Sequence, residues 1–284
     1  MIDWFGFTLV AMLFFALQNF FQKSAMQQKC NSAKLMTVIL GLVGLLALAS
    51  ALVTGDTWVN SWDLFFVLAA ANGFFFLTGA ILRLESLKYI PLVVMQPIKK
   101  MDGALAALAG VIIFGEVLSI PQIAGIALAV AVVWILARDR KSEKPEDFAK
   151  GVLLILAAVL LFTGSDVVMK PGVAEGSVFM FIAISYLVMF FPSLLLKKKV
   201  SKGRTASLET TLKWGMLLGG LNFFAITSLL NALRTGALSI IFPILSLGVV
   251  LTSGMGVLFH KEELTVNRII GTGLAVVVLV LMSM

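Results

Sequence analysis

The chain has 284 residues, of which 60% are hydrophobic and 13% are charged, and its formal net charge is +7. Soluble domains are about half apolar and about a quarter charged, so this composition argues against a water-soluble enzyme. A single cysteine, Cys30, excludes a disulfide framework and a multi-cysteine metal cluster. A single histidine, His260, excludes a site that needs two imidazoles. The mean hydropathy of +1.04 instead indicates a membrane protein.

Ten apolar blocks follow one another along the chain, each near the ~20 residues that cross a bilayer. We expect each to be a helix, because backbone inside a bilayer must satisfy its own hydrogen bonds. The blocks cover residues 4–22, 35–53, 63–82, 91–114, 120–137, 151–169, 177–196, 214–233, 237–259 and 267–283. The first lacks a basic leading segment and a cleavage site, so we interpret it as a retained helix and not a signal peptide. The predicted fold class is an all-α membrane protein with ten transmembrane helices.

The basic residues predict how the helices are oriented. Of the 22 Lys and Arg residues, 18 lie in the loops after the first, third, fifth, seventh and ninth blocks. Only Lys170 and Arg234 fall on the other side, and Lys99 and Lys100 fall inside a block. Cytoplasmic loops carry an excess of Lys and Arg, so we expect both termini to be extracytoplasmic. We expect the protein to reside in the inner or plasma membrane of the cell. Topology explains the basic loops more simply than a lipid-binding patch does, and no nucleic-acid partner is expected.

The chain aligns with itself at a shift of 146 residues. Pro97-Ile98 matches Pro243-Ile244, Gly110 matches Gly256, and Gly125 matches Gly271. We therefore predict two repeats, residues 1–140 and 141–284, joined by a polar linker over residues 138–150. Because each repeat holds five helices, the second enters the membrane from the opposite side. Inverted repeats of this kind recur in secondary transporters, with the substrate site near the midplane between the halves.

The duplication and its motifs are similar to those of a known family. Pro97, the run Gly115-Glu116-Val117-Leu118 and Gly125 resemble the drug/metabolite transporter superfamily, EamA-type branch, over nearly the whole chain. The resemblance implies the ten-helix fold, a transport function, and a translocation path lined by the first helix of each repeat. Two features depart from the family. The second repeat reads His260-Lys261-Glu262-Glu263-Leu264 where members usually have Gly-Glu, and both termini are predicted outside, so the family's usual direction of transport is not carried over.

The strongest polar cluster inside a predicted span is on the fourth helix. It consists of Gln96, Lys99, Lys100 and Asp102. Gln96 and the two lysines fall on one helical face, and Asp102 lies three residues after Lys99, where it can form an ion pair. A charge at the bilayer centre costs about 2.5–3.5 kcal/mol, so these side chains should face a cavity or a partner. One interpretation is a face of the central cavity with a spare positive charge, and the other is a buried pair that fixes helix packing.

A second set of polar residues is on the first helix of each repeat. Gln18, Asn19 and Lys23 lie on one strip of the first helix, and Asp166 and Lys170 occupy the related helix at the same spacing. We expect this strip to point towards protein or water. The alternative for the two lysines is that they reach the headgroups from a helix end.

Two asparagines complete the candidate site, Asn72 on the third helix and Asn222 on the eighth. Such residues either bind substrate or hold helices together by hydrogen bonds. Glu116 and Glu262 fall where helices end, and we interpret them as interfacial caps or contacts between helices. Pro97 and Pro243 lie inside predicted helices, where each removes a backbone donor and favours either a hinge or a static bend.

The leading hypothesis is a secondary transporter that moves a small polar or amphipathic organic solute by alternating access. An amino acid, a carboxylate or a phosphate-bearing solute would fit the lysines, and Asp102 or Asp166 could carry a coupling proton. No ATP-binding Gly-rich loop, catalytic residue, metal site or cofactor is expected. The expected partners are a small-molecule substrate and membrane lipids, and the oligomeric state stays open. The alternatives are a transporter of a lipid or lipid-linked headgroup and, from another class, an intramembrane enzyme or a non-transporting receptor.

Overall fold

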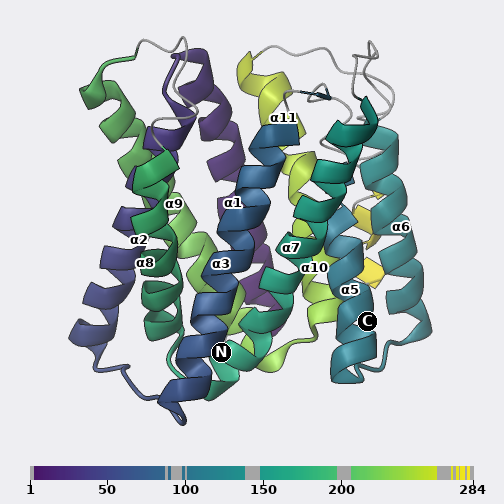
Figure 1. Cartoon of the computed structure of the whole chain (residues 1–284). Helices are drawn as coiled ribbons and strands as arrows, with labels where there is room; N and C mark the ends of the chain where they lie inside the picture. Colours follow the sequence, from purple (N-terminus) through teal and green to yellow (C-terminus); the bar gives the residue numbers. More distant parts are fainter. Residues whose placement is uncertain are drawn as a thin grey trace.

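The computed structural model describes residues 3–86, 89–90, 98–99, 101–137, 148–196, 206–260, 270, 273–274, 276–278 and 280–281. Its helices are α1 (Trp4–Gln27), α2 (Ser32–Thr54), α3 (Trp62–Ser86), α5 (Met101–Phe114), α6 (Ile120–Ala137), α7 (Phe148–Glu175), α8 (Val178–Leu196), α9 (Leu208–Thr235), α10 (Leu238–Ser246) and α11 (Gly248–His260). Over the described residues the fold is a helical bundle (Figure 1). Six of these helices are long and apolar enough to cross a membrane, so the chain is an integral membrane protein.

Polar side chains cap the starts of α1, α2 and α9, and α2 and α9 begin before their apolar blocks. The carboxylate of Asp3 accepts a hydrogen bond from the Gly6 N–H at 3.0 Å, and the Asn31 side chain accepts bonds from the first turn of α2. Ser207 does the same for α9, which begins at Leu208, six residues before the predicted apolar block. Each cap satisfies a backbone donor that the helix cannot pair internally. The caps therefore mark helix starts that hydropathy alone does not locate.

The ninth apolar block was predicted as one helix, and this prediction is wrong. The structure divides residues 237–259 into α10 and α11, with the break at Leu247. Pro243 lies inside α10 and supplies no N–H to the helical ladder. The described part of the fourth block is helical at residues 98–99 and from Met101, whereas most of the tenth block lies outside the described residues.

Helices of the first repeat pack on helices of the second. α3 lies against α7, α1 against α9, α2 against α8 and α9, and α5 against α10, an arrangement that Figure 1 shows as nearly parallel ribbons. Close approach depends on small residues such as Gly73 of α3. A Cβ atom at Gly73 would lie 2.7 Å from the Ser185 carbonyl oxygen of α8, so only glycine fits there. The core therefore belongs to both repeats jointly.

One end of the bundle is closed by loops of both repeats, and we call it the N-terminal end (bottom of Figure 1). It consists of the start of α1 and the segments 55–61, 115–119, 176–177 and 236–237. The Arg234 guanidinium donates to the Gly176 carbonyl at 3.1 Å, and the Ser177 hydroxyl donates to Asp56 at 2.9 Å. α1 begins at this end and α7 finishes there, so the first helices of the two repeats run in opposite directions.

Candidate functional site

A chain of hydrogen bonds joins three helices in the interior of the bundle. The Tyr186 hydroxyl of α8 donates to the side-chain oxygen of Asn222 in α9 at 2.6 Å. The Asn222 amide in turn donates to the Gln18 side-chain oxygen of α1 at 3.0 Å. Gln18 and Asn222 were predicted from the sequence, and Tyr186 was not. The structure therefore supports a role for Asn222 in holding helices together, and its role in substrate binding stays a prediction.

Asn72 of α3 makes a second connection between the repeats. Its amide donates to the Ser165 hydroxyl of α7 at 2.9 Å and to the Ser165 carbonyl at 3.1 Å. The Ser185 hydroxyl of α8 donates to the Ala69 carbonyl of α3 at 3.0 Å. These bonds pair polar groups that would otherwise be costly inside an apolar bundle.

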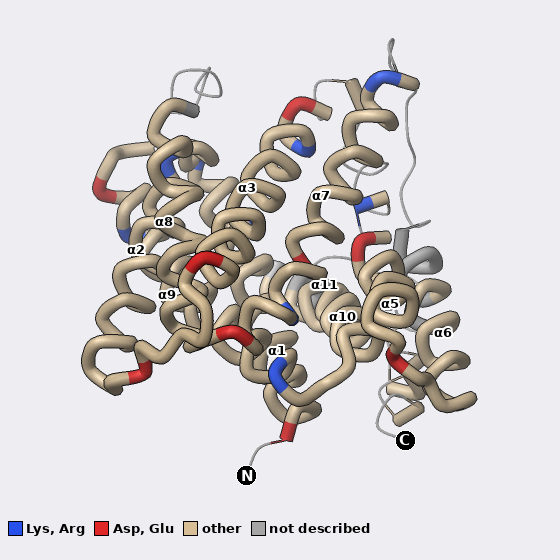
Figure 2. Tube along the Cα trace, turned by 60° about the horizontal axis from the view of Figure 1, so that its bottom comes forward, with Lys and Arg blue, Asp and Glu red and all other residues tan. Residues whose placement is uncertain are grey.

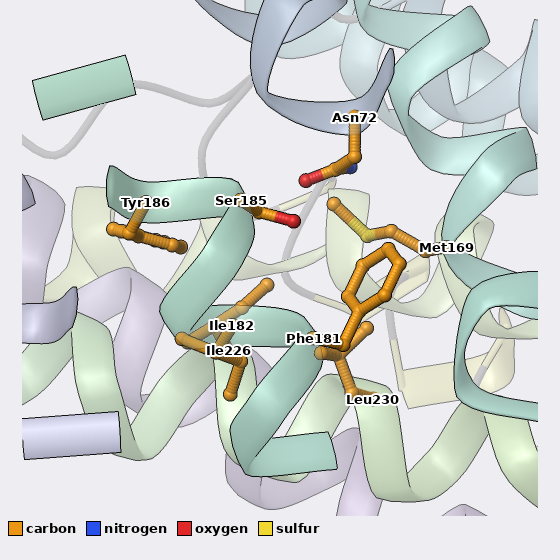
Figure 3. Close-up of a pocket in the computed structure, with 8 residues that line it drawn as sticks. All are labelled: Asn72, Met169, Phe181, Ile182, Ser185, Tyr186, Ile226 and Leu230. Carbon is orange, nitrogen blue, oxygen red and sulfur yellow. The ribbon is translucent and has the colours of Figure 1, made fainter. Parts of the chain in front are cut away.

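A small cavity of about 10 Å³, room for about one water molecule, lies beside these bonds. Figure 3 shows its lining, which comes from four helices: Asn72, Met169, Phe181, Ile182, Ser185, Tyr186, Ile226 and Leu230. Sites for small organic ligands are usually about 300–1,000 Å³. The cavity is therefore too small for a metabolite in the state described, although both repeats contribute to its wall.

Charged side chains on or beside α3, α5 and α7 interact electrostatically across the two repeats. Lys99 forms the predicted ion pair with Asp102 at 3.3 Å, and its amine also lies 5.4 Å from the centre of the Phe162 ring of α7. Asp166 of α7 interacts electrostatically with both members of this pair. Asp102 also acts on Arg83 of α3, which the sequence analysis assigned to a loop. We call Arg83, Lys99, Asp102 and Asp166 the charged cluster.

The charged cluster adds a second carboxylate, Asp166, to the one on the fourth helix. The expected spare positive charge counted both lysines, and it stays a prediction because Lys100 lies outside the described residues. Among the described residues, Asp102 interacts electrostatically with Arg83, and Asp166 interacts electrostatically with Lys99 and Asp102. The side chains of Lys99 and Asp102 are 24% and 18% exposed, so the pair is not sealed from its surroundings. Ion pairs are costly to desolvate, and apolar side chains of similar size can pack at least as well. Helix packing alone therefore does not explain why charged residues occupy these positions.

Some predicted residues do not join this group. Gln96 and Lys100 lie outside the described residues. Asn19 and Lys23 are exposed side chains of α1, and their role in the strip that was expected to point towards protein or water stays a prediction. Gln18 of the same helix accepts a hydrogen bond from Asn222 of the second repeat. Few charged positions interrupt the helices along their length, as Figure 2 shows.

Lys170 contacts a different partner, at the N-terminal end. It forms an ion pair with Glu116 of the loop between α5 and α6, and its amine lies 5.3 Å from the centre of the Phe114 ring. This contact replaces the alternative in which Lys170 reaches the headgroups. Glu116 also accepts backbone bonds from α10, which agrees with its interpretation as a contact between helices. Burial alone would raise the pKa of Glu116, but hydrogen bonds from Lys170, Ser239 and Leu238 together lower this pKa below its ordinary value.

The local fold explains why Glu116 points towards α10. Gly115 has φ +63°, a left-handed conformation that suits glycine. It ends α5, and the Glu116 N–H then donates back to the Gly110 carbonyl at 3.4 Å. A glycine after a helix followed by such a bond is a common helix-ending motif. The Gly-Glu pair in the sequence is the signal from which this contact could have been found.

A helical membrane bundle made of two matched halves, with polar and charged groups between them, has the architecture of a membrane transporter. A family model described as the EamA-like transporter family matches residues 4–138 and 149–284. The chain therefore belongs to the EamA-like transporter family, within the drug/metabolite transporter type, whose members are transporters and not enzymes. This confirms the resemblance inferred from the sequence.

Comparison with solved structures supports the same fold. One crystal structure superimposes with a TM-score of 0.81 and 16% sequence identity, over 97% of this chain and 94% of that chain. At this identity the likeness shows the fold alone. No curated protein matches the sequence.

Proposed function

We propose that the protein is a secondary transporter that moves a small polar or amphipathic organic metabolite by alternating access between two inverted repeats. The observation that carries the proposal is the charged cluster. Lys99 and Asp102, which form an ion pair, come from the first repeat, and Asp166, which interacts with both electrostatically, comes from the second. Charges in such a position are expensive and usually belong to a transport pathway.

The cluster also suggests the class of substrate. Its two signs suit a solute that carries both a carboxylate and an ammonium group, such as an amino acid, because each end would find an opposite charge. A carboxylate or phosphate-bearing solute would use the basic members alone. Asp166, which interacts electrostatically with Lys99 and Asp102, is the proposed carrier of a coupling proton.

Uptake into proteoliposomes tests the proposal. Purified protein is reconstituted and offered a panel of radiolabelled amino acids, organic acids and phosphate-bearing solutes, with and without a proton gradient. We expect Lys99→Gln to lower uptake of the transported solute at least tenfold. Lys213→Gln is the matched control, because Lys213 lies on the surface of α9 with its side chain 74% exposed, and it should transport normally. No uptake of any solute, or normal uptake by the Lys99 variant, would overturn the proposal.

The proposed orientation places the N-terminal end outside the cell. Thr57, in the loop after α2, is exposed at this end, and Gln27 is exposed at the opposite end of α1. Thr57→Cys should react with a membrane-impermeant thiol reagent on intact cells. Gln27→Cys should react only after the cells are permeabilised. The reverse pattern would show that the termini are cytoplasmic.

A further inference from the structure

The carboxylate of Glu116 sits at the start of α10, a helix of nine residues. One carboxylate oxygen accepts the Leu238 N–H at 2.8 Å, and the other accepts the Ser239 N–H, also at 2.8 Å. Ala237, the residue before α10, provides no side-chain cap. Glu116 therefore does from another segment what a capping residue normally does from within the helix.

A third donor reaches the same carboxylate from α7. Lys170 donates to the oxygen that also accepts the Leu238 N–H. The Glu116 side chain is only 8% exposed, so its charge is compensated by these donors and little by water. The carboxylate belongs to the first repeat, whereas all three donors belong to the second.

The side chain of Ser239 adds a fourth group to this site. Ser239 is fully buried, and its hydroxyl makes no other hydrogen bond among the described residues, whereas its side chain contributes to the lowered pKa of Glu116. Two backbone N–H groups at a helix start, an ammonium group and a hydroxyl are a donor set that binds anions. In this structure the carboxylate of Glu116 occupies this donor set.

We propose that Glu116 is a removable internal ligand, which closes the N-terminal end by occupying an anion site on the second repeat. The inference rests on the proposed alternating access. For the two repeats to separate at this end, the carboxylate must leave Leu238, Ser239 and Lys170 together. The vacated site then presents the same donors to the carboxylate of a solute that enters from this side.

We call the contact of Glu116 with Leu238, Ser239 and Lys170 the latch. Accessibility of the interface between α5 and α10 tests whether this contact closes the N-terminal end. Ala107 is 3% exposed and lies on the stripe of α5 that carries Gly103 and Gly110, both of which face α10. In the Ala107→Cys protein, a water-borne methanethiosulfonate reagent should modify the new thiol slowly. Adding Glu116→Gln should raise the rate at least tenfold, because the amide keeps one acceptor oxygen and turns an NH₂ group towards the donors. The protein without the introduced cysteine measures the background labelling of the buried Cys30, which is subtracted.

The matched control removes a carboxylate whose ion pair lies on the surface. Glu209→Gln breaks the pair with Lys213, in which both side chains are about three-quarters exposed, and should leave the labelling rate unchanged. Equal labelling of the Glu116→Gln protein and its parent would overturn the latch. If Glu116→Gln does not fold, Lys170→Gln, which removes one donor of three, should give a smaller increase in the rate.

Formate tests the anion site directly. Glu116→Ala leaves the donor set empty, so millimolar formate should bind there, slow the labelling of the cysteine at position 107, and raise the thermal stability of this variant. The parent, whose site is filled, should not respond. If formate protects the variant no better than chloride does, the anion site is refuted. Neither assay uses a transported solute, so the latch can fail while transport succeeds, or the reverse.

Discussion

Gly110 allows a quantitative test of how closely α5 and α10 approach at the latch. A Cβ atom at this position would lie 2.8 Å from the Ser239 nitrogen and 3.0 Å from its Cβ, and would collide with the Glu116 carboxylate. Ordinary contacts begin near 3.4 Å, so Gly110→Ala requires the helices to move apart by about 0.6 Å. Overpacking of this kind costs about 1–3 kcal/mol. Alanine also favours the helix over glycine by about 1 kcal/mol, which offsets part of the cost.

A second glycine provides a control for the change in helix propensity. Gly220 lies inside α9, and a Cβ atom there would meet nothing within 4 Å. Gly220→Ala should be stabilised by the higher helix propensity of alanine and should carry no cost of overpacking. The two variants should therefore differ by about 1–3 kcal/mol in the free energy of unfolding. Denaturant titration in detergent micelles, followed by tryptophan fluorescence, measures this difference. Equal stability of the two variants would refute the close contact between α5 and α10.

Three further predictions concern hydrogen bonds and charges. Tyr186→Phe should lower the free energy of unfolding by about 1–3 kcal/mol, because it leaves the Asn222 acceptor unpaired, whereas Tyr89→Phe, at the only other tyrosine, should have little effect in the same titration. Asp102→Asn should destabilise the protein by removing the partner of Lys99, and a double-mutant cycle with Lys99→Met should show a favourable coupling between the two positions. Because the folded pKa of Glu116 is lowered, its stabilisation should be complete above the ordinary glutamate pKa and be lost as pH falls through the folded value, so the stabilities of the parent and Glu116→Gln should converge in acid.

Hydropathy predicted where most helices lie, because a bilayer requires a long apolar helix whatever the identity of its side chains. It could not predict where they end. α1 continues to Gln27 and α9 begins at Leu208, since hydrogen bonds within the helix and its caps act beyond the apolar stretch. The break at Leu247 was also missed, because the Ser246 and Gly248 beside it are small residues that are common inside membrane helices and do not by themselves predict a break.

The contacts of the site were harder to predict because they join distant segments. Glu116 is 54 residues from Lys170 and 122 from Leu238, and its donors at α10 are backbone groups that no residue type identifies. Tyr186 was overlooked inside an apolar block, although its hydroxyl had to find a partner there. The spacing of Lys99 and Asp102 on one helix, by contrast, was enough to predict their ion pair.

The two repeats differ at three charged positions of the cluster, and this difference separates what the fold requires from what a site requires. At the shift of 146 residues, the second repeat has Leu245 and Gly248 at the positions of Lys99 and Asp102. The first helices of the two repeats align at a shift of 147 residues, which places Asn19 at the position of Asp166. In each case the uncharged residue lies in or beside a helix of the same bundle. Since the repeat forms without these charges, and since each charge is costly inside an apolar bundle, folding alone does not account for them. A polar solute that passes between the repeats would.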